Sequence, residues 1–224
     1  MVKKATVVYS IMGRIAIIYI ALLCLISCNN GNTREKEKNS RVERQNQVTK
    51  SILPIHIYRY ETFSRTKAEY LRAELQKVYP SVVLQDSSIE LPQKYYFKPR
   101  NRYSGNGLLR DLSVYKKNKV VLGLTNHVIY QANELSPTYG IFGVSPVGAH
   151  VAVISSIYPS GKKHTDEHLV KLMLHELGHA FGLNHCKDEH CYMVDAEHGN
   201  KFSKTSSFCK SCREFLNKQG WTLK

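Results

Sequence analysis

The spacing of apolar and polar positions predicts short strands and amphipathic helices after the first 50 residues. Positions 52–60 are rich in β-branched and aromatic residues, which favours a strand. Positions 66–78 repeat apolar residues at helical spacing, which predicts a helix directly after it. The polar, glycine-containing stretch at 105–107 is interpreted as a break between elements. Further short strands are predicted at 82–84, 95–97 and 120–124.

The second half of the chain contains the clearest pair of predicted elements. Positions 149–157 form an apolar run that predicts a strand, and Pro159-Ser160-Gly161 ends it. Thr165 or Asp166 can cap the helix that follows, and Gly182 stops it. This alternation predicts an α/β (α+β) domain with a small twisted mixed sheet and two or three helices.

The N-terminal 27 residues have the pattern of a signal peptide. A basic start precedes the apolar run 15–26, which is long enough for secretion but short for a bilayer span. The run ends in Leu25-Ile26-Ser27-Cys28, which resembles a bacterial lipobox. The resemblance implies cleavage before Cys28 and lipidation of its thiol. An uncleaved N-terminal helix anchor is the alternative, and Cys24 is a poorer lipidation site because bulky Leu23 precedes it.

Residues 29–50 are polar and almost free of apolar side chains, which predicts a flexible tether. The expected organisation is therefore a signal peptide at 1–27, a lipidated cysteine with its tether at 28–50, and one folded domain at 51–224. Both interpretations of the N-terminus place that domain outside the cytoplasm, attached to a bacterial membrane.

The chain is strongly basic, with 32 Lys and Arg against 18 Asp and Glu and a net charge of +14. Removing residues 1–27 takes away Lys3, Lys4 and Arg14 and leaves 14 minus 3, or +11. The charge is spread along the chain without a nucleic-acid-binding motif, so we interpret it as a solvated basic surface and expect no nucleic-acid partner.

The predicted late helix contains a metal-binding pattern, His175-Glu176-Leu177-Gly178-His179. Two histidines at i and i+4 lie on one helix face and can bind one tetrahedral zinc ion. Glu176 between them can accept a proton from a metal-activated water. Gly182 and His185 extend the pattern to H-E-x-x-H-x-x-G-x-x-H, in which the glycine lets the chain reverse so that His185 returns to the metal.

The extended motif resembles the metzincin clan of metallopeptidases, and the residues behind it resemble the archaemetzincin family. These residues are Cys186, Cys191 and Met193 in Cys191-Tyr192-Met193, and Cys209-Lys210-Ser211-Cys212. The resemblance implies a metzincin-like domain with an active-site helix, a methionine turn at Met193 beneath the catalytic metal and a zinc-bound C-terminal segment. It also implies a structural zinc held by Cys186, Cys191, Cys209 and Cys212.

The cysteine spacing has two interpretations. Cys-x4-Cys followed by Cys-x2-Cys is within the range that wraps one tetrahedral zinc. In an oxidising compartment the same four thiols can instead form two disulfides. The sequence alone leaves this choice open.

The function expected from these residues is hydrolysis of peptide bonds by a monomeric enzyme with two zinc ions, one catalytic and one structural. Glu176 is the expected general base and acid, and a peptide or protein substrate is expected to lie along an edge strand at 148–155. Two alternatives remain: a zinc-containing surface lipoprotein that acts as a binding module without significant proteolysis, and a zinc-buffering lipoprotein.

Overall fold

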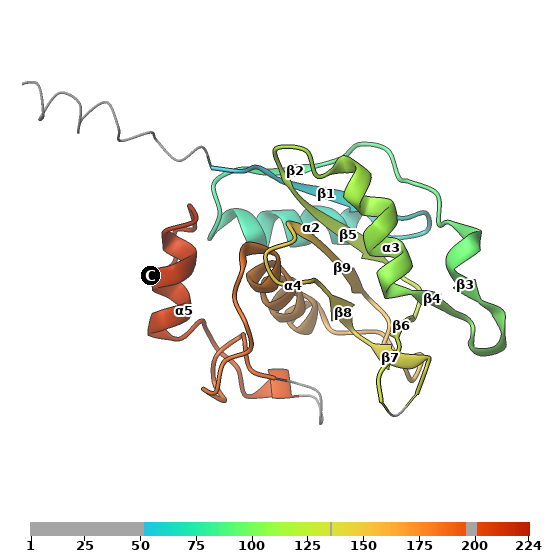
Figure 1. The fold of residues 1–224 in the computed structure, drawn as a ribbon. Coiled ribbons are helices and arrows are strands. Elements are labelled where there is room, and N and C mark those ends of the chain that lie inside the picture. The colour runs from blue at the N-terminus through green and yellow to red at the C-terminus, as the bar shows by residue number, and fades with distance from the viewer. Residues whose placement is uncertain (1–51, 135, 196–200) are drawn as a thin grey trace, which may run out of the picture. The chain divides into compact units, whose positions relative to one another are not determined.

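A five-stranded sheet runs through the middle of the folded domain in the computed structural model (Figure 1). The structure describes residues 52–134, 136–195 and 201–224, which belong to one unit. The strand order is β2-β1-β5-β9-β8, and all neighbours are parallel except β8, which is antiparallel to β9. The strands are β1 (Ile55–Arg59), β2 (Val82–Leu84), β5 (Val120–Thr125), β8 (Gly143–Val144) and β9 (Val151–Ser155).

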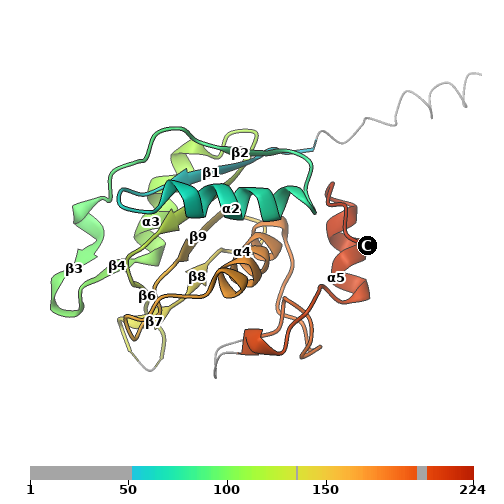
Figure 2. The same ribbon diagram turned by 180° about the vertical axis from the view of Figure 1, so that it is seen from behind.

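Helices cover both faces of this sheet. Helices α2 (Arg65–Gln76) and α4 (Asp166–Phe181) pack on one face, as Figure 2 shows, and α3 (Gly105–Leu112) packs on the other. Alternate residues of each central strand therefore belong to different apolar clusters. In β5, Leu122 and Leu124 pack with α2 and α4, whereas Val121 packs with α3. Burial on both sides explains why β5 and β9 are apolar runs without polar alternation.

A smaller four-stranded sheet, ordered β3-β4-β6-β7, extends from the α3 side of the domain. Its strands are β3 (Tyr96–Phe97), β4 (Arg102–Ser104), β6 (Ile129–Gln131) and β7 (Tyr139–Ile141). Short 3-10 turns η1 (Gln93–Tyr95), η2 (Lys98–Arg100), η3 (Ser113–Tyr115) and η4 (Lys201–Ser203) connect elements, and α5 (Lys210–Asn217) is the last helix.

The predicted mixed α/β fold is confirmed, and most predicted elements are found within a few residues. Thr165 caps α4, since its hydroxyl accepts the backbone N–H of His168 at 3.2 Å. Gly182 ends α4 with a φ of 113°, the left-handed conformation expected there. Predictions for the signal peptide, Cys28 and the tether lie outside the described residues. In the described part of the chain, no helix is both long and apolar enough to cross a membrane.

Two predictions from the sequence are wrong. The break expected at 105–107 is the start of α3, which Ser104 caps and which buries Leu108, Leu109 and Leu112. Gly107 is required there because a Cβ atom would lie 2.4 Å from the Tyr95 ring. The segment 148–155 is not an edge, because β9 lies between β5 and β8. The edge strand beside α4 is β8, whose two residues gave too short a signal.

Candidate metal centre and active site

Helix α4 holds two of the three expected metal ligands one turn apart. The Nε2 atoms of His175 and His179 are 3.1 Å from each other, and both side chains are buried. The chain turns at Gly182 and brings the exposed His185 back, with its ring centroid 4.8 Å from that of His179. One ligand atom from each histidine lies within 4.8 Å of the others. The structure thus brings the three predicted histidines together.

Backbone carbonyls orient the two helical imidazoles. His175 Nδ1 lies 2.7 Å from the carbonyl of Tyr192, and His179 Nδ1 lies 2.7 Å from that of Leu183. Each Nδ1–H donates to its carbonyl, which leaves the Nε2 lone pair of both histidines free to bind one metal ion between them. Burial, reinforced by His179, lowers the pKa of His175 to about 3, and burial also lowers the pKa of His179. Neutral imidazoles with fixed tautomers fit a zinc ion.

Glu176 lies in the helix between these histidines and faces the edge strand. A Cβ atom at Gly143 of β8 would lie 2.7 Å from the Glu176 Oε1 atom, so only glycine allows β8 to pass this close. Burial raises the pKa of the Glu176 carboxyl to about 8 in the metal-free chain. The carboxyl group is therefore buried between α4 and the edge strand, near the three histidines. Sequence reasoning did not identify Gly143 as part of this arrangement.

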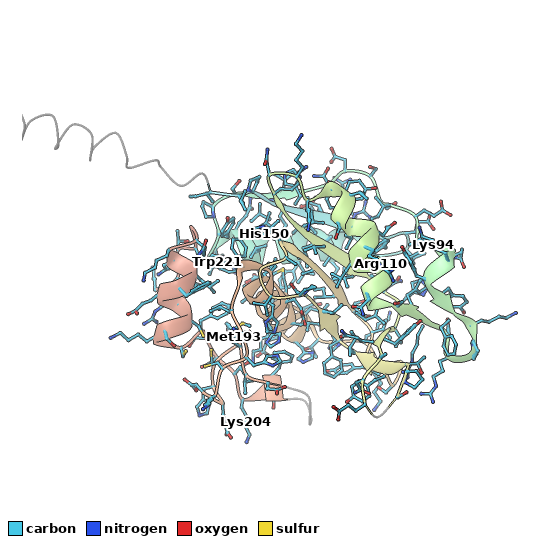
Figure 3. The ribbon with its side chains drawn as sticks, viewed as in Figure 1. Lys94, Arg110, His150, Met193, Lys204 and Trp221 are labelled. Atoms are coloured by element: carbon cyan, nitrogen blue, oxygen red, sulfur yellow. The ribbon has the colours of Figure 1, made fainter. Side chains whose placement is uncertain are left out.

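Met193 packs against the turn of α4 that carries His175 and His179 (Figure 3). A Cβ atom at Gly178 would lie 2.4 Å from the Met193 sulfur, so the glycine of the motif makes room for the methionine. The backbone carbonyl of Met193 accepts the N–H of Cys186 at 2.7 Å. This bond ties the chain after His185 to the methionine turn.

The four cysteines of the C-terminal segment form a second cluster. Their sulfurs all lie within 4.8 Å of one another, and all four thiols are free. Two backbone groups, the N–H of Met193 and that of Cys209, donate to the Cys191 sulfur at 3.4 and 3.3 Å. Burial raises the pKa of the Cys191 thiol to about 11, and these two bonds oppose that shift by favouring the thiolate, which is the form that ligates zinc. The cluster fits a closed tetrahedral zinc site.

The sheet, the active-site helix and the convergent histidines define a zinc metallopeptidase. The family model described as "Peptidase family M54" matches residues 56–218, and the chain belongs to this family, the archaemetzincins. It is a hydrolase, and its substrates are peptides or proteins.

Relatives and solved structures agree with this assignment. The archaemetzincin of Methanopyrus kandleri is 34% identical over 131 residues, covering 58% of this chain and 74% of the relative. The archaemetzincin of Pyrococcus horikoshii is 32% identical over 146 residues, covering 56% and 72%. The crystal structure of archaemetzincin from Archaeoglobus fulgidus, complexed with malonate, matches with a TM-score of 0.60 and 26% identity over 72% of this chain and 99% of that one. The M. kandleri structure matches with a TM-score of 0.60 and 27% identity, covering 76% and 96%.

Proposed function

We propose that His175, His179 and His185 hold the catalytic zinc and that Glu176 is the general base and acid of peptide-bond hydrolysis. The convergence of three imidazole side chains beside one buried carboxyl group carries this proposal. Bound zinc supplies Lewis acidity, which acidifies water and polarises a carbonyl group. The positive charge of a bound metal also favours the ionised Glu176 carboxylate and so prepares it to accept a proton.

Glu176 then acts twice in one turnover. Its carboxylate takes a proton from the attacking water and delivers that proton to the nitrogen of the leaving amine as the peptide C–N bond breaks. The carboxylate is regenerated at the end, and one water molecule is consumed for each bond cleaved. Its burial excludes competing water from the proton path.

The substrate backbone is proposed to pair with β8. This strand ends the five-stranded sheet, pairs with β9 on one side, and passes closest to Glu176 at Gly143. An extended peptide can add to such an edge as a further strand, which places a scissile carbonyl beside the carboxyl group. This proposal replaces the expectation from the sequence that the substrate lies along residues 148–155.

Comparison of Glu176→Gln with the wild-type domain in a peptide-library cleavage assay tests the catalytic proposal. We expect folding and the zinc content to be preserved and turnover to fall by at least about a hundredfold, because proton transfer is lost and no ligand is removed. Equal cleavage by the two proteins would refute the role of Glu176. A loss of zinc in the variant would show that the carboxyl group contributes to metal binding instead.

The second proposed zinc is structural and is held by Cys186, Cys191, Cys209 and Cys212. The free, clustered thiols support a total of two zinc ions per chain. A closed four-thiolate site has no open position for substrate, so its role is to fold the C-terminal segment.

We further propose that the enzyme is a lipoprotein, anchored through Cys28 outside the cytoplasm of a bacterial cell. The lipobox-like sequence before Cys28 supports this. Metabolic labelling with a fatty acid should mark the wild-type chain and not Cys28→Ser. Undiminished label on the variant would show that another residue is lipidated, with Cys24 as the next candidate.

A further inference from the structure

The segments before β1, β2, β5 and β9 and the C-terminal segment meet at one edge of the sheet. Lysines lie in three of them, with one in 76–81, three in 112–119 and two in 217–224. The segments 76–81, 112–119, 145–150 and 217–224 contain no Asp or Glu in the sequence. Hydrogen bonds join them: the N–H of Val120 donates to Pro54, that of Ile55 to Ser81, and that of Thr222 to Val78. We call these four segments, with residues 52–54, the basic edge. Its lysines are Lys77, Lys116, Lys117, Lys119, Lys218 and Lys224, of which Lys77 is paired with Glu74 of α2 at 2.6 Å.

Exposed apolar side chains lie among these lysines. Val114 is 75% exposed at the tip of the loop before β5, and Val147 is 49% exposed in the loop before β9. Ile52, at 44% exposure, lies beside Gly220 and so beside the C-terminal lysines. Tyr115 stacks on Tyr58 of β1, which fixes the Val114 tip against the sheet.

The opposite edge of the sheet has a different character. The loops that follow β1 and β2 contain Glu61, Asp86 and Glu90. Figure 3 shows His150 and Trp221 on the side where β1 begins, above Met193. The opposite edge thus carries both signs of charge, because the loop after β9 contains Lys162 and Lys163. The basic edge also adjoins the candidate active site, since the N–H of Gly148 donates to the carbonyl of His179 at 2.8 Å.

We propose that the basic edge is a docking surface for anionic lipid headgroups. Lysine ammonium groups are compact, hydrated charges that suit a diffuse anionic surface, and an exposed valine between them can enter the headgroup region. The chain enters the domain at Ile52, within this edge, so an anchor upstream of residue 52 would keep this edge within reach of the bilayer. The contribution of the anchor rests on the proposed lipoprotein, whereas the lysines and the exposed apolar side chains support the docking surface independently of it.

Vesicle binding by residues 51–224 tests the proposal without Cys28. The A. fulgidus structure, 99% of which is matched, shows that a chain of this domain alone folds. We expect binding to vesicles with about one-third phosphatidylglycerol, no binding to pure phosphatidylcholine, and release at about 0.5 M salt. Lys116→Glu with Lys117→Glu should weaken binding at least about tenfold.

The matched control is Lys162→Glu with Lys163→Glu, an adjacent pair in the loop after β9 with the same change in charge. Its effect should be clearly smaller. Val114→Ser, at an exposed position that does not threaten folding, should also weaken binding. Absence of binding to the anionic vesicles, or equal weakening by the two lysine pairs, would overturn the proposal. The labelling experiment on Cys28 is read separately, so failure of the anchor and failure of this surface are distinguishable.

Discussion

Helix α4 and the segment that follows it in the chain are ordered by different interactions. Helix α4 is capped at both ends, satisfies its own backbone hydrogen bonds and is buried along most of its length. The described parts of residues 184–209 contain only the short turn η4 as a helix. Isolated bridges, Cys186 with Val194 and Cys191 with Ser207, and the four thiols hold this segment. Both regions contribute to one core, since Met193, Phe202 and Phe208 are buried in the same cluster as α4. The second region has little regular structure, so we expect it to depend more on its cysteine cluster.

The two regions nevertheless share the candidate catalytic centre. His185 adjoins Cys186, and the Tyr192 carbonyl that orients His175 adjoins Cys191. The C-terminal segment therefore supplies one expected ligand and also fixes the tautomer of a ligand on α4. Loss of the cysteine cluster should therefore weaken catalytic zinc binding in two ways, through His185 and through the orientation of His175.

The largest effect is expected from Cys209→Ser, which removes a cysteine far from the histidines in sequence. Loss of the structural zinc should loosen the chain at His185 and Tyr192 and lower catalytic zinc affinity by about 10- to 100-fold. Competition with a chromophoric chelator measures this affinity. Ser206→Ala, an exposed change in the same segment, is the control and should leave it unchanged. Unaltered catalytic zinc affinity in Cys209→Ser would separate the two sites.

An intermediate effect is expected from Gly182→Ala, at the junction of the two regions. Its φ of 113° is unfavourable for alanine, which should cost about 1 kcal/mol or more of stability and misplace His185. Gly161→Ala is a matched control, because Gly161 also has a positive φ of 84° but lies in a surface turn with open space around it. Urea unfolding should report a loss in both variants, whereas zinc affinity should fall only in Gly182→Ala. Equal zinc affinities would contradict the role assigned to this turn.

The smallest effect concerns pH and the buried histidines before and within α4. Burial, helped by neighbouring His168, lowers the pKa of His164 from 6.5 to about 3. The unfolded chain therefore binds more protons between these values, and stability should be complete above pH 6.5 and decline as pH falls toward 3. Urea midpoints of the metal-free domain measure this decline, which should be shallower in His164→Gln. Identical slopes would show that His164 is not the group responsible.

The sequence predicted the two regions unequally. The i, i+4 histidines, the cap at Thr165 and the stop at Gly182 are local features of one helix, and the structure has them where they were expected. The packing of Met193 on Gly178, the role of Gly143 and the carbonyls of Tyr192 and Leu183 were not predicted. Every residue has a backbone carbonyl, so the sequence cannot single out the two that orient the histidines. A strand of two residues is too short to show an alternating pattern. Only the tertiary packing defines these contacts.

Helix α3 is an element whose local sequence predicted the wrong structure. Its glycines indicated a break, yet the close approach of Tyr95 demands Gly107, and the burial of three leucines stabilises the helix despite the low propensity of glycine. Local propensity therefore failed where a specific neighbour, distant in sequence, determined the residue.

The most direct test of the two-site account is a count of zinc ions by native mass spectrometry, combined with thiol alkylation. The wild-type domain should contain two zinc ions with four thiols that react only after chelation. His179→Ala should retain one zinc with the thiols still protected, since the cysteine site does not require the histidines. A single zinc in the wild-type domain, together with two disulfides among Cys186, Cys191, Cys209 and Cys212, would contradict the second site and the coupling derived from it.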